Sequence, residues 1–143
     1  MVPLNDQQRR FLEENHSAAM ITMARDGTPK VARVGAALID GRVWSSATRD
    51  RLRTKRLRRD PRSVLYVHSA TPAWLAIEAT VTILDGPEAP ENNLRLFRVM
   101  QGKSTGPLQW FGGELDEGAY REAMVQEQRL IFQFEVHHAY GLI

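Results

Sequence analysis

The stretch SSATRDRLRTKRLRRDPR, residues 45–62, concentrates the positive charge of this 143-residue chain. It contains eight of the nineteen lysines and arginines but only two acidic residues, Asp50 and Asp60. The basic residues are Arg49, Arg51, Arg53, Lys55, Arg56, Arg58, Arg59 and Arg62. The rest of the chain has eleven basic and fifteen acidic residues, a net charge of −4. This local excess of cations predicts a docking site for phosphate or carboxylate; the alternative is a solvated basic helix face.

The composition of the chain limits the kinds of protein it can be. For 143 residues we expect a single domain, residues 1–143, with one core. No apolar run approaches the roughly 18 residues of a membrane span, and residues 1–15 are too polar for a secretion signal. The absence of cysteine excludes disulfides, thiolate metal sites and cysteine nucleophiles. We therefore expect a cytoplasmic protein that does not engage a membrane.

Turn signals divide the first part of the chain into a helix and three strands. Asn5 is a good N-cap for a first helix. Asp-Gly turns at residues 26–27 and 40–41 separate the strands that follow, because this dipeptide accommodates positive φ. The predicted strands cover residues 18–24, 30–39 and 42–46. Two such turns in succession predict an antiparallel meander.

The basic stretch itself reads as a helix, with Thr48 as its N-cap and Pro61 ending it at Asp60. The remaining predicted elements are strands over 63–68, 74–84 and 130–136, helices over 90–101 and 114–127, and an irregular segment over 102–113. Six antiparallel strands with short helices between them predict a mainly β fold, a six-stranded antiparallel β-barrel that is either closed or split.

Several common catalytic motifs are absent. His16, His68, His137 and His138 fit no metal-ligand spacing, so we expect no metal site. The chain has no GxSxG elbow, no GxGxxG after a strand and no Walker A motif. If the protein is an enzyme, a bound cofactor supplies the reactive group, and the sequence identifies no catalytic side chain. Residues 45–48 (SSAT) suit cofactor binding, because hydroxyls and free backbone N–H groups at a helix start bind anions.

The run RTKRLRRDPR, residues 53–62, follows a strand end that reads Ser-x-Ala, and together they resemble the signature of split-barrel flavin and deazaflavin reductases. These proteins form the pyridoxamine 5′-phosphate oxidase-like superfamily. Within it, the chain resembles the small coenzyme F420-dependent oxidoreductases of actinobacteria, the B group. Further agreement lies in residues 26–29, 74–80 with Glu78, 120–125 and 138–142, so the resemblance spans nearly the whole chain.

The resemblance implies the FMN-binding split-barrel fold and a homodimer with two cofactor sites at the subunit interface. The implied cofactor is F420, a 5-deazaflavin whose side chain carries a phosphate and a polyglutamate tail; the alternative is FMN. The implied cofactor-binding residues are Lys30, Val31, Ala32, Arg33 and Val34 along the ring, Ser46, Ala47 and Thr48 at the ribityl chain and phosphate, Arg51 and Arg53 at the phosphate, Lys55 or Arg56 toward the tail, and Trp74 and Leu75 from the partner strand. The family often has Lys where Arg53 stands and Asn where Arg56 stands. Both differences keep or add positive charge, and they leave the choice between F420 and FMN open.

The resemblance also implies a reaction, hydride transfer from C5 of reduced F420 to an electrophilic carbon of a small organic substrate. The alternatives are an FMN-dependent oxidase or reductase of the same fold, and a non-catalytic protein that holds a cofactor or a tetrapyrrole. Tyr66, His68 and Tyr140 could donate a proton or serve packing alone. Trp110 and Phe111 either cover the substrate pocket or plug the core. We expect no nucleic-acid partner, since no aromatic residues interleave the arginines to stack bases.

Overall fold

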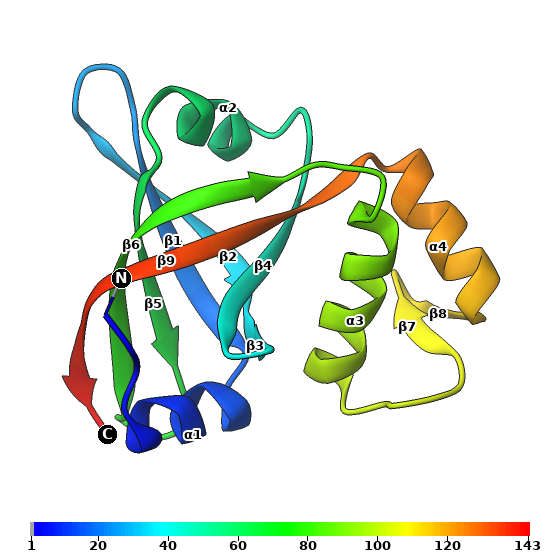
Figure 1. Cartoon of the computed structure of the whole chain (residues 1–143), viewed down its shortest axis with the longest axis horizontal. Helices are drawn as coiled ribbons and strands as arrows, with labels where there is room; N and C mark the ends of the chain where they lie inside the picture. Colours follow the sequence, from blue (N-terminus) through cyan, green and yellow to red (C-terminus); the bar gives the residue numbers. More distant parts are fainter. Residues whose placement is uncertain (1) are drawn as a thin grey trace.

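A seven-stranded antiparallel sheet curls around the core in the computed structural model, which describes residues 2–143, and a small helical lobe stands beside it (Figure 1). The strand order is β2-β1-β5-β6-β9-β4-β3. These strands are β1 (Ser17–Met23), β2 (Pro29–Gly35), β3 (Ala37–Ile39), β4 (Arg42–Thr48), β5 (Arg62–His68), β6 (Trp74–Leu84) and β9 (Arg129–Leu142). The other elements are α1 (Asp6–Glu14), α2 (Leu52–Arg59), α3 (Ala89–Gln101), α4 (Glu117–Gln126) and a hairpin of β7 (Leu108–Trp110) and β8 (Gly113–Leu115).

The predicted caps and turns explain the first half of the fold. Asn5 caps α1 through a capping box with Gln8, in which each side chain accepts a hydrogen bond from the other residue's backbone. Gly27 has φ +86° in the β1–β2 turn, and Gly41 has φ +76° in the β3–β4 turn. These are left-handed conformations that glycine adopts at little cost. The meander that the two Asp-Gly turns predict is therefore confirmed in outline.

One predicted strand is wrong in its continuity. The sequence predicts a single strand over 30–39, but the chain breaks at Ala36, whose N–H donates to the carbonyl of His16 at 2.9 Å. Ser45 Oγ also donates to the Gly35 carbonyl at 2.6 Å. The break lets β2 pair with β1 at one edge of the sheet while β3 pairs with β4 at the other edge. Two consecutive strands thus hold the two edges of the curled sheet together, which gives the split-barrel shape.

The core lies inside the curl, where alternate side chains of each strand point inward. The inward residues of β5, β6 and β9 are fully buried, among them Leu65, Ile77 and Phe132. Burial of each such side chain stabilises the fold by about 1.5–3 kcal/mol. Leu12 of α1 and Leu57 of α2 join the same cluster, so these two helices cover opposite ends of the barrel (Figure 1).

The second half of the chain contains more β structure than the sequence predicts. The count of six strands is wrong for the main sheet, which has seven. The segment predicted to be irregular, 102–113, contains β7, and β8 continues into the helix predicted over 114–127, which begins only at Glu117. The last strand extends to Leu142 because it pairs with the whole length of β6, with a bulge at His137 opposite Glu78 and Ala79. No helix of residues 2–143 combines the length and apolar character needed to cross a bilayer.

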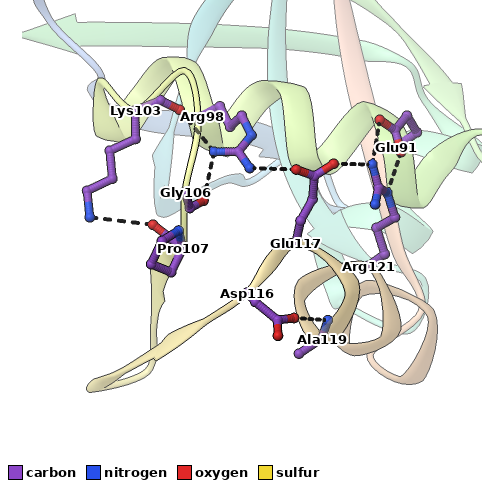
Figure 2. A network of polar contacts seen from close by, with 9 residues as sticks. All are labelled: Glu91, Arg98, Lys103, Gly106, Pro107, Asp116, Glu117, Ala119 and Arg121. Atoms are coloured by element: carbon purple, nitrogen blue, oxygen red, sulfur yellow. Dashed lines mark hydrogen bonds and ion pairs between the residues drawn. The ribbon is translucent and has the colours of Figure 1, made fainter.

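The lobe of α3, α4 and the hairpin has a small core of its own. Leu94, Leu108, Tyr120 and Met124 are buried there. Figure 2 shows the polar network on its surface, in which Glu117 of α4 accepts from both Arg98 of α3 and Arg121. Arg121 also pairs with Glu91 at 2.7 Å, and Arg98 donates to the carbonyls of Lys103 and Gly106. These bonds tie α4 and the loop before the hairpin to α3.

Candidate anion-binding site

The basic stretch leaves the sheet later than its sequence predicts. Thr48 is the last residue of β4, and it is paired with Arg129 of β9. Three further residues pass before α2 begins at Leu52, so the N-cap is Arg51, which makes no side-chain capping bond. The prediction of Thr48 as N-cap is therefore wrong. Thr48 instead donates from its hydroxyl to Asp50 at 3.1 Å, and its carbonyl accepts from the Thr54 hydroxyl at 2.8 Å.

A cavity of about 250 Å³ lies between the start of α2, the edge strand β2 and the lobe. Strands contribute Arg33, Val34 and Gly35 of β2, Ser46 of β4 and Arg129 of β9 to its lining. Helices contribute Arg51 at the N-cap of α2, Arg53 of α2, and Phe97 and Met100 of α3. Four of these residues are arginines and none is acidic. The cavity thus has a strongly positive wall, with an apolar part formed by α3, and it suits a ligand that carries both an anionic group and an apolar one.

Within residues 2–143, Arg53 is the one cavity residue that has a buried polar atom without a hydrogen-bond partner. Its Nε is buried and has no hydrogen-bond partner within residues 2–143. Burial lowers the pKa of the Arg53 guanidinium, and the nearby charges of Arg51 and Arg129 lower it further. Arginine nevertheless stays protonated in proteins. Arg53 therefore remains a buried cation that lacks a hydrogen-bond partner and is repelled by its neighbours, and this destabilises the ligand-free protein. A bound anion would supply both the missing acceptor and the missing countercharge.

Ion pairing distinguishes Arg33, Arg51 and Arg53 of the cavity from Arg49, Arg58 and Arg62 of the basic stretch. Within residues 2–143, Arg33, Arg51 and Arg53 form no ion pair with a carboxylate. In contrast, Asp85 accepts from Arg49 at 2.8 Å and from Arg58 at 3.1 Å. These two contacts hold the pKa of Asp85 below its usual range, that with Arg49 most strongly.

Arg62 is neutralised in the same way. It pairs with Asp60 at 2.8 Å, and its hydrogen bonds lower the pKa of Asp60 to about 2. Arg59 donates to the Met23 carbonyl. The end of the basic stretch therefore anchors α2 and β5 to the barrel, and the start of the stretch faces the cavity.

Comparison with known proteins assigns the family. A sequence model described as pyridoxamine 5′-phosphate oxidase matches residues 4–141. This chain belongs to the pyridoxamine 5′-phosphate oxidase family. The family contains oxidoreductases, as the oxidase in its description indicates. The positive cavity fits a phosphate group, because the unpartnered Arg53 Nε lacks an acceptor of that kind.

Several solved structures have the same fold as this chain. A conserved hypothetical protein, Rv2991, from Mycobacterium tuberculosis has a TM-score of 0.74 at 19% identity, over 99% of this chain and 86% of that one. A protein titled F420 reductase has a TM-score of 0.72 at 17% identity, over 96% and 98%. A putative pyridoxamine 5′-phosphate oxidase from Listeria innocua has 0.67 at 16%, over 96% of both chains. At these identities the similarity shows the shared fold alone.

The structure brings together part of the residue set that the family resemblance implies. Five members line the cavity, namely Arg33, Val34, Ser46, Arg51 and Arg53. Four others, Lys30, Val31, Ala32 and Thr48, lie next to the cavity residues along β2 and β4. The remaining members lie elsewhere: Ala47 is fully buried in the core, Lys55 is exposed on α2 outside the lining, and Trp74 and Leu75 begin β6.

The residues that the resemblance assigns to the partner subunit lie on β6, away from this chain's own cavity lining. Trp74 stacks on Tyr66, with ring centroids 5.6 Å apart, and meets Tyr140 edge-on at 6.0 Å. Leu75 is fully buried in the barrel core, and it is paired with Val67 of β5 on one side and Gly141 of β9 on the other.

Four lining residues escaped the sequence prediction: Gly35, Phe97, Met100 and Arg129. Arg129 is the most informative, since it is far from the basic stretch in sequence and reaches the cavity through the pairing of β9 with β4. The pairing of two strands so far apart could not be read from the chain. An isolated arginine directly before the apolar run LIF was the one available signal.

Proposed function

We propose that this protein is an F420-dependent oxidoreductase that uses reduced deazaflavin to reduce an electrophilic carbon of a small organic substrate. The observation that carries the proposal is the buried Arg53 Nε without a hydrogen-bond partner, in a cavity lined by four arginines and no acidic residue. When bound, the cofactor supplies the hydride. The task of the protein is to hold the phosphate and tail at one end and to orient the ring beside the substrate.

The cofactor phosphate is assigned to Arg51 and Arg53. A phosphate in contact with both would give the Arg53 Nε its acceptor and would relieve its repulsion by Arg51. Arg51 also stands at the start of α2, where backbone N–H groups point outward and favour an anion. Arg33 lies across the cavity on β2 and offers a further cation for the acidic tail or the phosphate.

Ser46 and β2 are assigned to the ribityl chain and the ring. Asn93 Nδ2 donates to the Ala89 carbonyl at 2.9 Å, which fixes its Oδ1 as an acceptor for the Ser46 hydroxyl at 2.5 Å. Because the Ser46 hydroxyl donates its hydrogen to Asn93, its oxygen can accept a hydrogen bond from a ribityl hydroxyl of the ligand. Strand β2 pairs with β1 on one side and lies at the edge of the sheet, so its outer backbone groups can bind the ring.

A second copy of the chain is assigned to the outer face of β5, β6 and β9. This face carries the aromatic row of Tyr66, Trp74, Tyr140 and His138, in which neighbouring rings lie 5.2–6.0 Å apart. Tyr66 and Tyr140 are more than one-third exposed, which is unusual for large apolar side chains grouped on a strand face. In a homodimer this face would be covered, and Trp74 would approach the partner's cofactor.

A deuteride-transfer assay tests the proposed reaction. Reduced F420 with deuterium at C5 is mixed with the protein and a panel of quinones, enones and nitroaromatic compounds. We expect deuterium on the reduced product only when protein is present. The FMN alternative is tested in parallel, because the same arginines can bind the phosphate of FMN. Binding of F420 without transfer to any member of the panel would favour a non-catalytic cofactor-binding protein, and transfer from reduced FMN alone would favour an FMN enzyme.

A further inference from the structure

Arg129 is held at the rim of the cavity by two residues outside it, Glu127 and Trp110. We propose that Arg129 is a ligand-binding residue for the anionic group, that Glu127 positions it, and that the β7–β8 hairpin is thereby part of the binding site. The proposal takes its ligand, a phosphate or a neighbouring carboxylate of a cofactor side chain, from the proposed function. The basic stretch points to neither Glu127 nor Arg129, and the sequence assigns Trp110 only to the substrate pocket or the core.

The backbone places Arg129 beside the start of the basic stretch. Arg129 pairs with Thr48 across the β4–β9 ladder, and the Arg49 N–H donates to the Gln128 carbonyl at 3.0 Å. Gln128 has φ +54°, a left-handed conformation that is uncommon for a residue other than glycine. This tight turn lets the chain pass from α4 directly into β9, so Glu127 and Arg129 lie on either side of it.

The side-chain bonds leave one part of the Arg129 guanidinium free for a ligand. Its Nε donates to Glu127 Oε1 at 3.0 Å, and the side chain is only 10% exposed. Within residues 2–143 its two amino groups have no hydrogen-bond partner, and the residue lines the cavity. Arg53 lines the same cavity, so both guanidinium groups face the space that an anion would occupy. A guanidinium held at Nε with free amino groups is preorganised for a bidentate contact with an anion.

Trp110 completes the support from the hairpin. Its indole Nε1 donates to the second carboxylate oxygen of Glu127 at 2.8 Å, and Arg129 Cζ lies 5.0 Å from its ring centroid. The same ring packs edge-on against Phe97 at 4.9 Å. Trp110 therefore packs in the lobe and also supports a cavity arginine. Next to it, Phe111 is 82% exposed at the hairpin tip with φ +46°.

The chain offers a matched control for this arrangement. Arg95 donates to Asp40 at 2.8 Å, and its Cζ lies 5.9 Å from the ring of Trp44, so it too combines a carboxylate and an indole. Arg95 is absent from the cavity lining. The Arg95 side chain is 47% exposed and that of Arg129 is 10% exposed, so Arg95→Gln controls for the loss of one charge and one ion pair outside the cavity. A ligand-binding role belongs to Arg129 alone.

The test is equilibrium titration of the full-length protein with two probes, F420 and inorganic pyrophosphate, at low and high salt. For Arg129→Gln we expect a roughly ten- to hundredfold weaker affinity for both probes, the loss of one charge-assisted contact. Its affinity should also depend less steeply on salt, a readout that a merely structural role would not move. Arg129→Lys should recover part of the affinity, since it keeps the charge without the bidentate geometry.

The positioning role of Glu127 has its own variant. Glu127→Gln keeps an acceptor for Trp110 but loses the charge that orients Arg129, so we expect a several-fold weaker affinity for both probes, with the fold kept by circular dichroism. Arg95→Gln should bind both probes as the wild type does. Wild-type affinity in Arg129→Gln would overturn the proposal, and so would an equal loss in Arg95→Gln. If the wild type binds pyrophosphate but not F420, and Arg129→Gln weakens that binding, the proposed function fails while the role of Arg129 stands.

Discussion

Replacement of Arg53 by methionine should stabilise the ligand-free protein while it weakens anion binding. Arg53 contains a buried donor without a partner, and an unsatisfied buried donor costs about 1–3 kcal/mol. The side chain is only partly buried, so we take the lower end, about 1 kcal/mol. Methionine has a similar length and no polar group. For a chain of this size, 1 kcal/mol corresponds to a rise in Tm of about 3–5 °C.

The assay is thermal unfolding at low and high salt, with and without pyrophosphate. The gain of Arg53→Met should shrink in salt, because part of the cost is repulsion by Arg51 and Arg129. Pyrophosphate at one hundred times the wild-type Kd should stabilise the wild type by about 2.7 kcal/mol, but the variant by only about 0.4–1.4 kcal/mol, because loss of one charge-assisted contact weakens binding roughly ten- to hundredfold. Arg58→Met is the control, which loses an exposed ion pair with Asp85 worth at most about 1 kcal/mol. A lower Tm for Arg53→Met than for the wild type at low salt would refute the reasoning, since it would mean that the protein already satisfies this guanidinium.

Three further variants test other parts of the structure. In the wild type, the contribution of Asp85 to the free energy of unfolding is present above pH 4 and is lost as the pH falls through its lowered pKa. Asp85→Asn removes this contribution, so the free energy of unfolding of the variant should vary less with pH below 4. Leu57→Ala should cost about 2–5 kcal/mol in urea unfolding, since Leu57 is the buried anchor of α2. Trp74→Glu should convert a dimer into a monomer in analytical ultracentrifugation, with the barrel fold kept by circular dichroism; an unchanged mass would place the interface elsewhere.

Local signals in the sequence predict most of the elements. The Asp-Gly turns, the capping residue Asn5 and Pro61 each act on their immediate neighbours, and the strand over 74–84 has the bounds that its composition predicts. The break at Ala36 and the length of β9 depend instead on pairing with distant strands, and no local pattern contains that information. The β7–β8 hairpin was missed for a related reason, because its strands have only three residues each.

The candidate site could be predicted only where it is built from consecutive residues. Arg51 and Arg53 follow from the charge run, and the family resemblance adds Arg33 and Ser46, all of which line the cavity. The sequence does not predict which arginines form ion pairs. Asp85 directly follows β6 and approaches Arg49 and Arg58 only in the folded chain. The same limit applies to Arg129, whose place is set by strand register.

The central claim is that the cavity with four arginines binds the anionic side chain of F420. The most direct measurement is an equilibrium titration of the purified protein with F420, compared with FMN, for the wild type and the double variant Arg51→Gln plus Arg53→Gln. We expect micromolar or tighter binding of F420 by the wild type, tighter than that of FMN, and a loss of at least about a hundredfold in the double variant, for two charge-assisted contacts. A folded wild-type protein that does not bind F420, or a double variant that binds it equally well, would contradict the account.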